Sequence, residues 1–294
     1  MTTDLKLMKT PISYYGGKQR IASQIVDVLE SIPHTVYAEP FSGGLAVLYA
    51  KRLRKSDSDY REAINDINQC LITFWRIARD RPDELQRYIE LTPYSQEEYL
   101  VSKQIYNNPS EYDEIKIAWA VYIQCNMSFA KQIGKGWGVS TMGENSAATW
   151  HNRKANLPQA FKRLEKVHIG CEDALRFIER WDSPQTLHYV DPPYPNTSQG
   201  HYGGYTLDDY QALCDALDNC QGSYVLSNYA QEIVPKSAQQ LIEIETLMSA
   251  ANGKDRSKVD TKRTEKLWIC DRSEAIRDDL KLVLGDRNQI ELFA

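Results

Sequence analysis

Short apolar runs alternate along this chain with longer stretches in which apolar residues recur every three or four positions. The short runs predict buried strands. They occupy residues 35–38, 61–66, 166–170, 187–190, 224–227, 241–246 and 266–270. The longer stretches predict amphipathic helices. They occupy residues 21–29, 45–55, 175–181 and 207–217. Strands that alternate with helices predict an α/β sheet domain.

The middle of the chain follows a different pattern, in which helices succeed one another. Residues 67–105 read as helix broken at Pro82 and Pro93, because proline interrupts a helix. A further apolar helix is predicted at residues 115–125 and a basic one at residues 151–166. We therefore predict one α/β domain. It comprises residues 1–74 and 161–294 and is interrupted by a helical insertion at residues 75–160.

Asp191-Pro192-Pro193-Tyr194 directly follows the apolar run at residues 187–190. The prolines end that strand, so the tetrapeptide lies at its carboxyl end, where open α/β sheets bind ligands. The Asp191 carboxylate and the Pro192 carbonyl can accept two hydrogen bonds, and Tyr194 offers an aromatic face. This set suits a planar ring that carries an exocyclic amino group. The alternative is an ordinary turn, which Asp-Pro often starts.

Two glycine-containing segments near the amino terminus each precede a helix. In the first, Gly16, Gly17 and Lys18 stand before a helix whose start favours an anionic group. The second, residues 39–44, follows a strand but lacks the full G-x-G-x-x-G spacing, so it supports a dinucleotide site poorly. A ligand with an amino-acid end and an adenosine end is compatible with both. Asp66, 27 residues after Glu39, is near the spacing of an acid that binds ribose hydroxyls, although a surface turn is the alternative.

The distribution of charged residues along the chain is more informative than the overall composition. The 294 residues carry a net charge of −5 and six cysteines without a C-x-x-C pair, which favours free thiols in a reducing cytoplasm and no metal site. The polar start is no signal peptide, and we expect no membrane span. Residues 116–170 nevertheless hold eight Lys or Arg against two Glu. This excess predicts a phosphate-binding face, with a solvated helix surface as the alternative.

Residues 126–140 mix glycine, lysine, amides and aromatics, which is typical of a hairpin or loop that enters a groove. Amides and lysines can contact base edges and phosphates, and aromatic rings can wedge between bases. The candidate DNA-binding residues here and in the basic helix are Asn126, Phe129, Lys131, Lys135, Trp137 and Arg153.

Four motifs in this order resemble those of the Dam-type (D12 class) DNA adenine-N6 methyltransferases over nearly the whole chain. They are Tyr15-Gly16-Gly17-Lys18, Glu39-Pro40-Phe41-Ser42-Gly43-Gly44, Asn65-Asp66-Ile67-Asn68 and Asp191-Pro192-Pro193-Tyr194. The resemblance implies a Rossmann-like, S-adenosylmethionine-dependent methyltransferase sheet, mixed, with its last strand antiparallel, and a helical target-recognition insertion. It implies cofactor contacts from Tyr14, Lys18, Glu39, Phe41, Gly43, Asp66, Asp173 and Asp191. The insertion matches the family only loosely, so the family's four-base target is not carried over.

The function expected from this resemblance is site-specific methylation of adenine N6 in duplex DNA, with the base flipped out and Asp191, Pro192 and Tyr194 as catalytic residues. Cytosine-N4 methylation, for which Ser-Pro-Pro-Tyr is more typical, is one alternative. RNA adenine methylation and a non-catalytic DNA-binding regulator are others. We expect a cytoplasmic protein, bacterial or phage-encoded, that is a monomer or weak dimer. The sequence leaves open a partnership with a cognate restriction endonuclease.

Overall fold

The strands predicted from the sequence join into a single sheet. The computed structural model describes residues 8–52, 59–139, 145–194, 204–228, 233–247 and 262–274, and this part of the chain holds a seven-stranded sheet of order β3-β2-β1-β4-β5-β7-β6. Its strands are β1 (Val36–Glu39), β2 (Arg61–Asn65), β3 (Val167–Gly170), β4 (Thr186–Val190), β5 (Ser223–Asn228), β6 (Gln240–Leu247) and β7 (Lys262–Cys270). Strands β1 to β5 pair in parallel, whereas β7 runs antiparallel to both β5 and β6. The prediction of a mixed sheet with a reversed last strand is confirmed.

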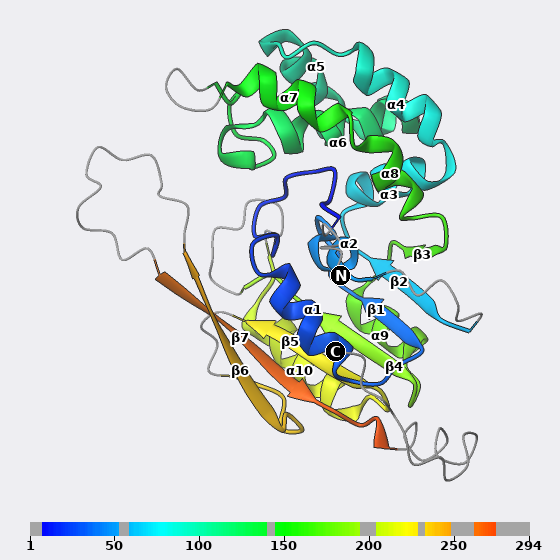
Figure 1. Ribbon diagram of the computed structural model, residues 1–294, viewed down its shortest axis with the longest axis vertical. Helices are drawn as coiled ribbons and strands as arrows, with labels where there is room; N and C mark the ends of the chain where they lie inside the picture. The colour runs from blue at the N-terminus through cyan, green and yellow to red at the C-terminus, as the bar shows by residue number, and fades with distance from the viewer. Residues whose placement is uncertain are drawn as a thin grey trace, which may run out of the picture.

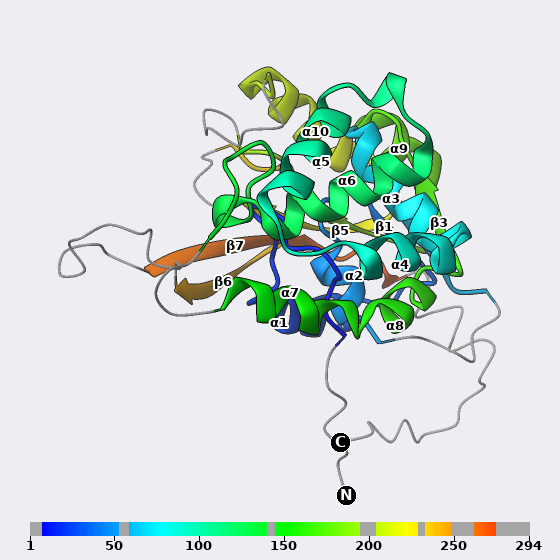
Figure 2. The same cartoon turned by 90° about the horizontal axis from the view of Figure 1, so that it is seen from above.

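Helices cover both faces of this sheet, as Figure 2 shows. On one face lie α1 (Ala22–Glu30) and α2 (Ala46–Ala50), which pack against each other, and on the other lie α9 (Ala174–Trp181) and α10 (Leu207–Asn219). Successive strand residues serve opposite faces: Tyr189 belongs to the core on the α1 side, and Val190 belongs to the core on the α10 side. Both faces of the parallel strands are therefore buried, which explains their continuous apolar runs.

Helix α2 is shorter than the stretch at residues 45–55 that the pattern predicted. It ends at Ala50 because Lys51 adopts an extended conformation (ψ 143°). The Lys51 ammonium is buried and pairs with the carboxylate of Glu30 at 2.6 Å. Residues 53–55 of the predicted helix lie outside the described residues.

The insertion between β2 and β3 is helical, as predicted. It consists of α3 (Gln69–Asp80), α4 (Pro82–Leu91), α5 (Gln96–Asn107), α6 (Glu114–Met127), α7 (Ser146–Lys154) and α8 (Leu157–Lys162), with short 3-10 turns at Pro109–Glu111 and Phe129–Lys131. The basic helix predicted over residues 151–166 is divided between α7 and α8. Its interruption follows from Pro158, whose ring would clash with the Lys154 carbonyl in a continuous helix.

The insertion is joined to the sheet by a shared core. Figure 1 shows α4 to α7 gathered at one end of the sheet, with α3 and α8 between them and the strands. Trp75 of α3 packs on Tyr49 of α2, with ring centroids 6.1 Å apart, and its indole N–H donates to the Gly43 carbonyl at 3.1 Å. The predicted boundaries at residues 75 and 160 fall inside α3 and α8, so neither coincides with the end of an element. None of the described helices is long and apolar enough to cross a membrane.

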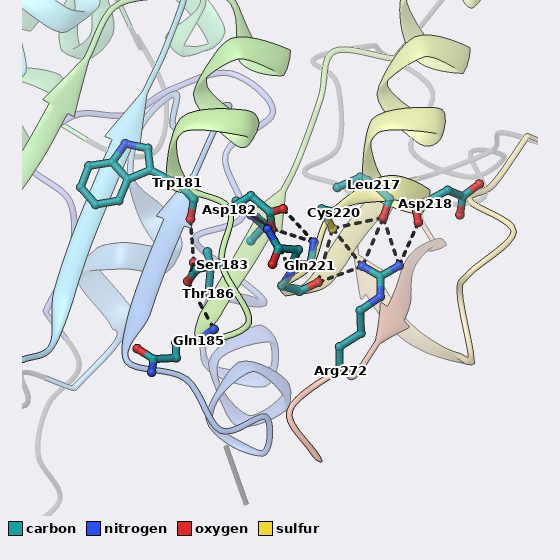
Figure 3. Close-up of polar contacts among 12 residues, drawn as sticks. Trp181, Asp182, Ser183, Gln185, Thr186, Leu217, Asp218, Cys220, Gln221 and Arg272 are labelled. Carbon is teal, nitrogen blue, oxygen red and sulfur yellow. Dashed lines mark hydrogen bonds and ion pairs between the residues drawn. The ribbon is translucent and has the colours of Figure 1, made fainter. Parts of the chain in front are cut away.

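The amino-terminal edge of β4 and β5 is fixed by a polar network, shown in Figure 3. Arg272, just after β7, donates to the carbonyls of Leu217 (3.3 Å) and Gly222 (2.9 Å) and places its positive charge at the carboxyl end of α10. The Asp182 carboxylate accepts the N–H groups of Gln221 and Gly222, each at 2.9 Å or less. These contacts hold the residues after β7 at the amino-terminal edge of the sheet. Asp191, which follows β4, lies at the opposite, carboxyl-terminal edge.

Candidate active site

Asp191 and Tyr194 lie at the carboxyl end of β4, as the sequence indicated, and meet side chains from two distant segments. The Lys18 ammonium lies 2.7 Å from the Asp191 carboxylate and 3.1 Å from the Tyr194 hydroxyl. Glu265 of β7 accepts the Tyr194 hydroxyl at 2.9 Å and lies 3.5 Å from the same ammonium. These four side chains form the polar centre: one cation, two carboxylates and one phenol.

Local structure explains how Lys18 reaches this centre. The N–H of Gly17 donates to the Tyr14 carbonyl at 3.1 Å, and Gly16 occupies the left-handed region at φ 77°. Lys18 follows this tight turn directly and reaches Asp191 at the end of β4, and α1 begins four residues further on, at Ala22. A side chain at position 16 would strain the turn, which is why glycine is suited there.

The polar centre has strongly perturbed ionisation. Burial alone would lower the pKa of Lys18, but Asp191, Tyr194 and Glu265 together raise it well above its usual value. Burial and the nearby Glu265 raise the pKa of Asp191, against the opposing effect of Lys18. Burial also raises the pKa of Tyr194 well above the usual range, so its hydroxyl stays protonated. Lys18 is therefore a permanent cation placed between two carboxylates.

A cavity of about 70 Å³ opens beside the polar centre. It is lined by the turn around Gly16, by Glu39 at the end of β1, by the loop from Phe41 to Gly44, and by Tyr189 and Asp191. Burial raises the pKa of Glu39 to about 8, and its carboxyl group accepts the Tyr37 hydroxyl at 2.7 Å.

Two buried hydroxyl groups in this cavity indicate that it binds a polar ligand. The hydroxyls of Ser42 and Tyr189 are buried and find no hydrogen-bond partner among the described residues. Buried polar groups are normally satisfied, so these two hydroxyls are available to a bound molecule. A Cβ atom at Gly44 would come within 2.6 Å of the Tyr14 Cβ, so the close packing of Tyr14 on this loop requires glycine there.

A second cavity, of about 320 Å³, adjoins the first and shares Phe41 and Pro193 with it. Its polar lining includes Asp66, Glu172 and Asp173, and the exposed side chain of Ile67 supplies an apolar wall. The Asp66 carboxylate accepts the N–H groups of Gly43 (3.0 Å) and Asn68 (2.9 Å), so it also joins the glycine loop at residues 39–44 to the segment at residues 65–68. Asp173 caps α9 by accepting the N–H of Leu175 at 3.0 Å. The two cavities together suit an elongated ligand.

All the candidate cofactor residues line one or both of these cavities. Tyr14, Lys18, Glu39, Gly43 and Asp191 lie on the first, Asp66 and Asp173 on the second, and Phe41 on both. Glu265 was not predicted as a site residue, because the predicted strand began one residue later, at position 266, whereas β7 begins at Lys262. Ser227 and Asn228, two polar residues at the end of an otherwise apolar buried strand, were the signal that a polar partner must pair with β5.

The candidate DNA-binding residues divide into an exposed group and an internal group. Phe129 is 48% exposed, and Lys135 is exposed beside it. Both belong to a narrow turn closed by an antiparallel bridge between Ser128 and Trp137. The Lys131 ammonium donates to the Asn126 carbonyl at 2.9 Å, and Trp137 is half-buried with its ring centroid 5.7 Å from that of Tyr94.

Asn126 is not positioned to read bases, contrary to the expectation from sequence. Its side chain is 3% exposed, and its amide oxygen accepts the Arg153 guanidinium at 2.6 Å and the N–H of Ser13 at 3.3 Å. Its amide nitrogen donates to the Tyr122 carbonyl at 3.1 Å. Arg153 also donates to the Ser13 hydroxyl at 2.8 Å. Asn126 and Arg153 therefore fasten the segment that carries the first glycine turn to the insertion.

Comparison with protein-family models identifies one family. A model of the D12 class N6 adenine-specific DNA methyltransferases matches residues 14–253. No curated protein matches the sequence. Among solved structures, a putative methyltransferase yhhF from Escherichia coli is similar at 10% identity and a TM-score of 0.34, covering 88% of this chain and 91% of that chain. The rRNA methyltransferase aviRa from Streptomyces viridochromogenes is similar at 11% identity and a TM-score of 0.36, covering 90% of this chain and 89% of that chain.

Proposed function

The chain belongs to the D12 class N6 adenine-specific DNA methyltransferase family, and from that premise we propose that Asp191, Pro192 and Tyr194 act on an adenine flipped out of duplex DNA. The family makes the protein an enzyme that uses S-adenosylmethionine as methyl donor and DNA as substrate. The observation that carries the proposal is the polar centre, in which a partly exposed Asp191 stands beside the first cavity with its carboxylate fixed by Lys18.

We assign the methionine end of S-adenosylmethionine to the first cavity and its adenosine end to the second. The unpartnered hydroxyls of Ser42 and Tyr189 support the first assignment, since a polar ligand would satisfy them. The Asp191 carboxylate supplies negative charge that suits a sulfonium group, the Glu39 carboxyl group offers a hydrogen-bond acceptor to an ammonium group, and Asp66 suits ribose hydroxyls. Tyr14, Lys18, Phe41, Gly43 and Asp173 complete the binding surface.

Bound there, S-adenosylmethionine would supply an electrophilic methyl group to N6, with the electron pair of the carbon–sulfur bond leaving on sulfur. The protein must make N6 nucleophilic, because the nitrogen lone pair is delocalised into the ring. Asp191 and the Pro192 carbonyl accept the two amino hydrogens and localise the lone pair. After transfer, the surplus proton on N6 passes to the Asp191 carboxylate and from there to water.

Tyr194 holds the plane of the base in this proposal. Its hydroxyl is anchored by Lys18 and Glu265, which fixes the ring and leaves the aromatic face for stacking. Fixing the ring in advance reduces the entropy lost when the base is positioned for attack. Stacking also offsets part of the few kcal/mol that unstacking the base costs.

The helical insertion, residues 75–160, is proposed as the target-recognition region, with Phe129 and Lys135 as the side chains that meet DNA. The exposure of both, on a turn closed by the Ser128–Trp137 bridge, supports this assignment. An exposed aromatic ring on a narrow turn suits insertion between bases, and a lysine suits phosphate or guanine. We further propose that the protein is cytoplasmic, which its six free cysteines support, and that it is a monomer or weak dimer.

The proposal is tested by expressing the protein in a host without adenine methylation and sequencing its DNA by a single-molecule method. We expect N6-methyladenine in one discrete sequence motif. An Asp191→Ala variant should still bind DNA and S-adenosylmethionine but leave the genome unmethylated. Methylcytosine in place of methyladenine, or no modified base despite cofactor binding, would overturn the proposal.

A further inference from the structure

Resting on the proposed methyl transfer, we propose that Glu265 is a second carboxylate of the reaction centre, which positions Lys18 and Tyr194 and keeps the net charge of the centre negative. One oxygen of Glu265 accepts the Ser227 hydroxyl at 2.6 Å and the Tyr194 hydroxyl at 2.9 Å, and the same oxygen lies 3.5 Å from the Lys18 ammonium. The Glu265 side chain is 10% exposed.

The reversed strand β7 explains how this carboxylate reaches the site. Parallel strands bring their carboxyl ends to the ligand-binding edge, whereas an antiparallel strand brings its beginning there. Asn228, the last residue of β5, pairs with Lys266, so Glu265 lies just past the end of β5. The Ser227 hydroxyl on β5 then fixes the carboxylate orientation. The antiparallel strand thus contributes a residue near its start to this edge, where a parallel strand would contribute its last residues.

The role of Glu265 follows from the charges of the polar centre, in which one ammonium group faces two carboxylates. Lys18 with Asp191 alone would be a neutral pair, in which the ammonium satisfies the carboxylate that has to accept the amino hydrogens. Glu265 shares Lys18, so Asp191 retains more negative charge for N6, which gains positive charge during transfer. Besides Glu39, whose carboxyl group lines the same cavity, the described residues place two titratable phenols near Asp191: Tyr194 in the same loop and Tyr189 on β4, both with pKa values raised by burial. Neither of them offsets the second carboxylate.

This role predicts that the loss of the Glu265 charge affects the stability of the fold and the rate of methyl transfer in different directions. Two partly buried carboxylates that share one cation repel each other, and this repulsion destabilises the folded protein in the absence of substrate. Removing one charge should therefore preserve or raise the melting temperature while the rate of methyl transfer falls. A residue that only supported the fold would behave in the opposite way, because its loss would lower the melting temperature first.

The test compares Glu265→Gln with a matched control, Glu243→Gln, on the neighbouring strand β6. The glutamine oxygen can still accept from Ser227 and Tyr194, so the first variant removes chiefly the charge. Glu243 is an exposed residue whose side chain is 54% accessible and lies 3.9 Å from the Lys266 ammonium. Single-turnover methylation, the dissociation constant of S-adenosylmethionine, the pH dependence of kcat and the melting temperature are measured for both variants and the wild type.

For Glu265→Gln we expect a methyl-transfer rate lowered at least tenfold, with binding of S-adenosylmethionine and DNA within threefold of the wild type. Because Glu265 raises the pKa of Asp191, the acid limb of kcat should also move to lower pH. Glu243→Gln should leave the rate and the pH profile unchanged.

A rate within twofold of the wild type, or a loss of rate that accompanies a lower melting temperature and an unmoved acid limb, would overturn the inference. The wild type serves as the reference for the reaction itself. If it forms N6-methyladenine, such a result counts against Glu265 alone. If it does not, the proposed function fails, and the inference fails with it.

Discussion

Substitution of Gly44 by alanine should weaken cofactor binding selectively, because the added methyl group has no room. Its Cβ would lie 2.6 Å from the Tyr14 Cβ, whereas non-bonded carbon atoms are comfortable at about 3.5–4.0 Å. Tyr14 must therefore move by about 1 Å, away from the first cavity that it lines. Overpacking of this kind costs about 1–3 kcal/mol. If that cost falls on the cavity, the dissociation constant of S-adenosylmethionine should rise about fivefold to 150-fold.

Isothermal titration calorimetry measures this dissociation constant directly, and thermal unfolding of the free protein shows how much of the strain falls on the fold. Gly136→Ala is the matched control, since the same methyl group there meets nothing within 4 Å. The control should bind S-adenosylmethionine as the wild type does. A Gly44→Ala protein whose dissociation constant stays within twofold of the wild-type value would refute the idea that Tyr14 and the glycine loop form the cofactor surface.

Three further predictions concern stability, pH and DNA. Arg272→Met should lower the free energy of unfolding by about 2 kcal/mol in urea titrations, because it leaves the carbonyls of Leu217 and Gly222 without their charged donor; an unchanged free energy would contradict this. Burial raises the pKa of Glu39 from 4.5 to about 8, so between these two pH values the folded protein keeps a proton on Glu39 that the unfolded chain loses. The free energy of unfolding should therefore fall as the pH rises from 4.5 to about 8. Urea titrations at pH 6 and 8 should therefore show a smaller decline for Glu39→Gln than for the wild type, and equal declines would argue against a protonated Glu39. Phe129→Ala should raise the KM for DNA about tenfold with unchanged cofactor affinity, whereas Leu91→Ala, which truncates another exposed apolar side chain, should change neither.

The parts of the site that the sequence predicted are those formed by residues close together in the sequence. The prolines after β4 end a strand by local chemistry, and the glycine loops precede helices for equally local reasons. The early end of α2 was not predictable, since it depends on the burial of Lys51 against Glu30. Asn126 was misinterpreted because composition shows that an amide is present but not that four groups of the fold already satisfy it. Glu265 was not predicted because it reaches the site only through the pairing of β7 with β5.

The position of β7 has a consequence for synthesis of the protein. This strand is the last described element to leave the ribosome, yet it lies between β5 and β6. Within the described sheet, β6 pairs only with β7, so a growing chain that has completed β6 still holds it without a neighbour. Domains generally fold as units, from the amino terminus onward during translation. A chain interrupted before Glu265 would carry Lys18, Asp191 and Tyr194 without the carboxylate that accepts the Tyr194 hydroxyl and lies 3.5 Å from the Lys18 ammonium. Methylation by this protein should therefore begin only after β7 has been synthesised, and products truncated before Glu265 should be inactive even where they bind DNA.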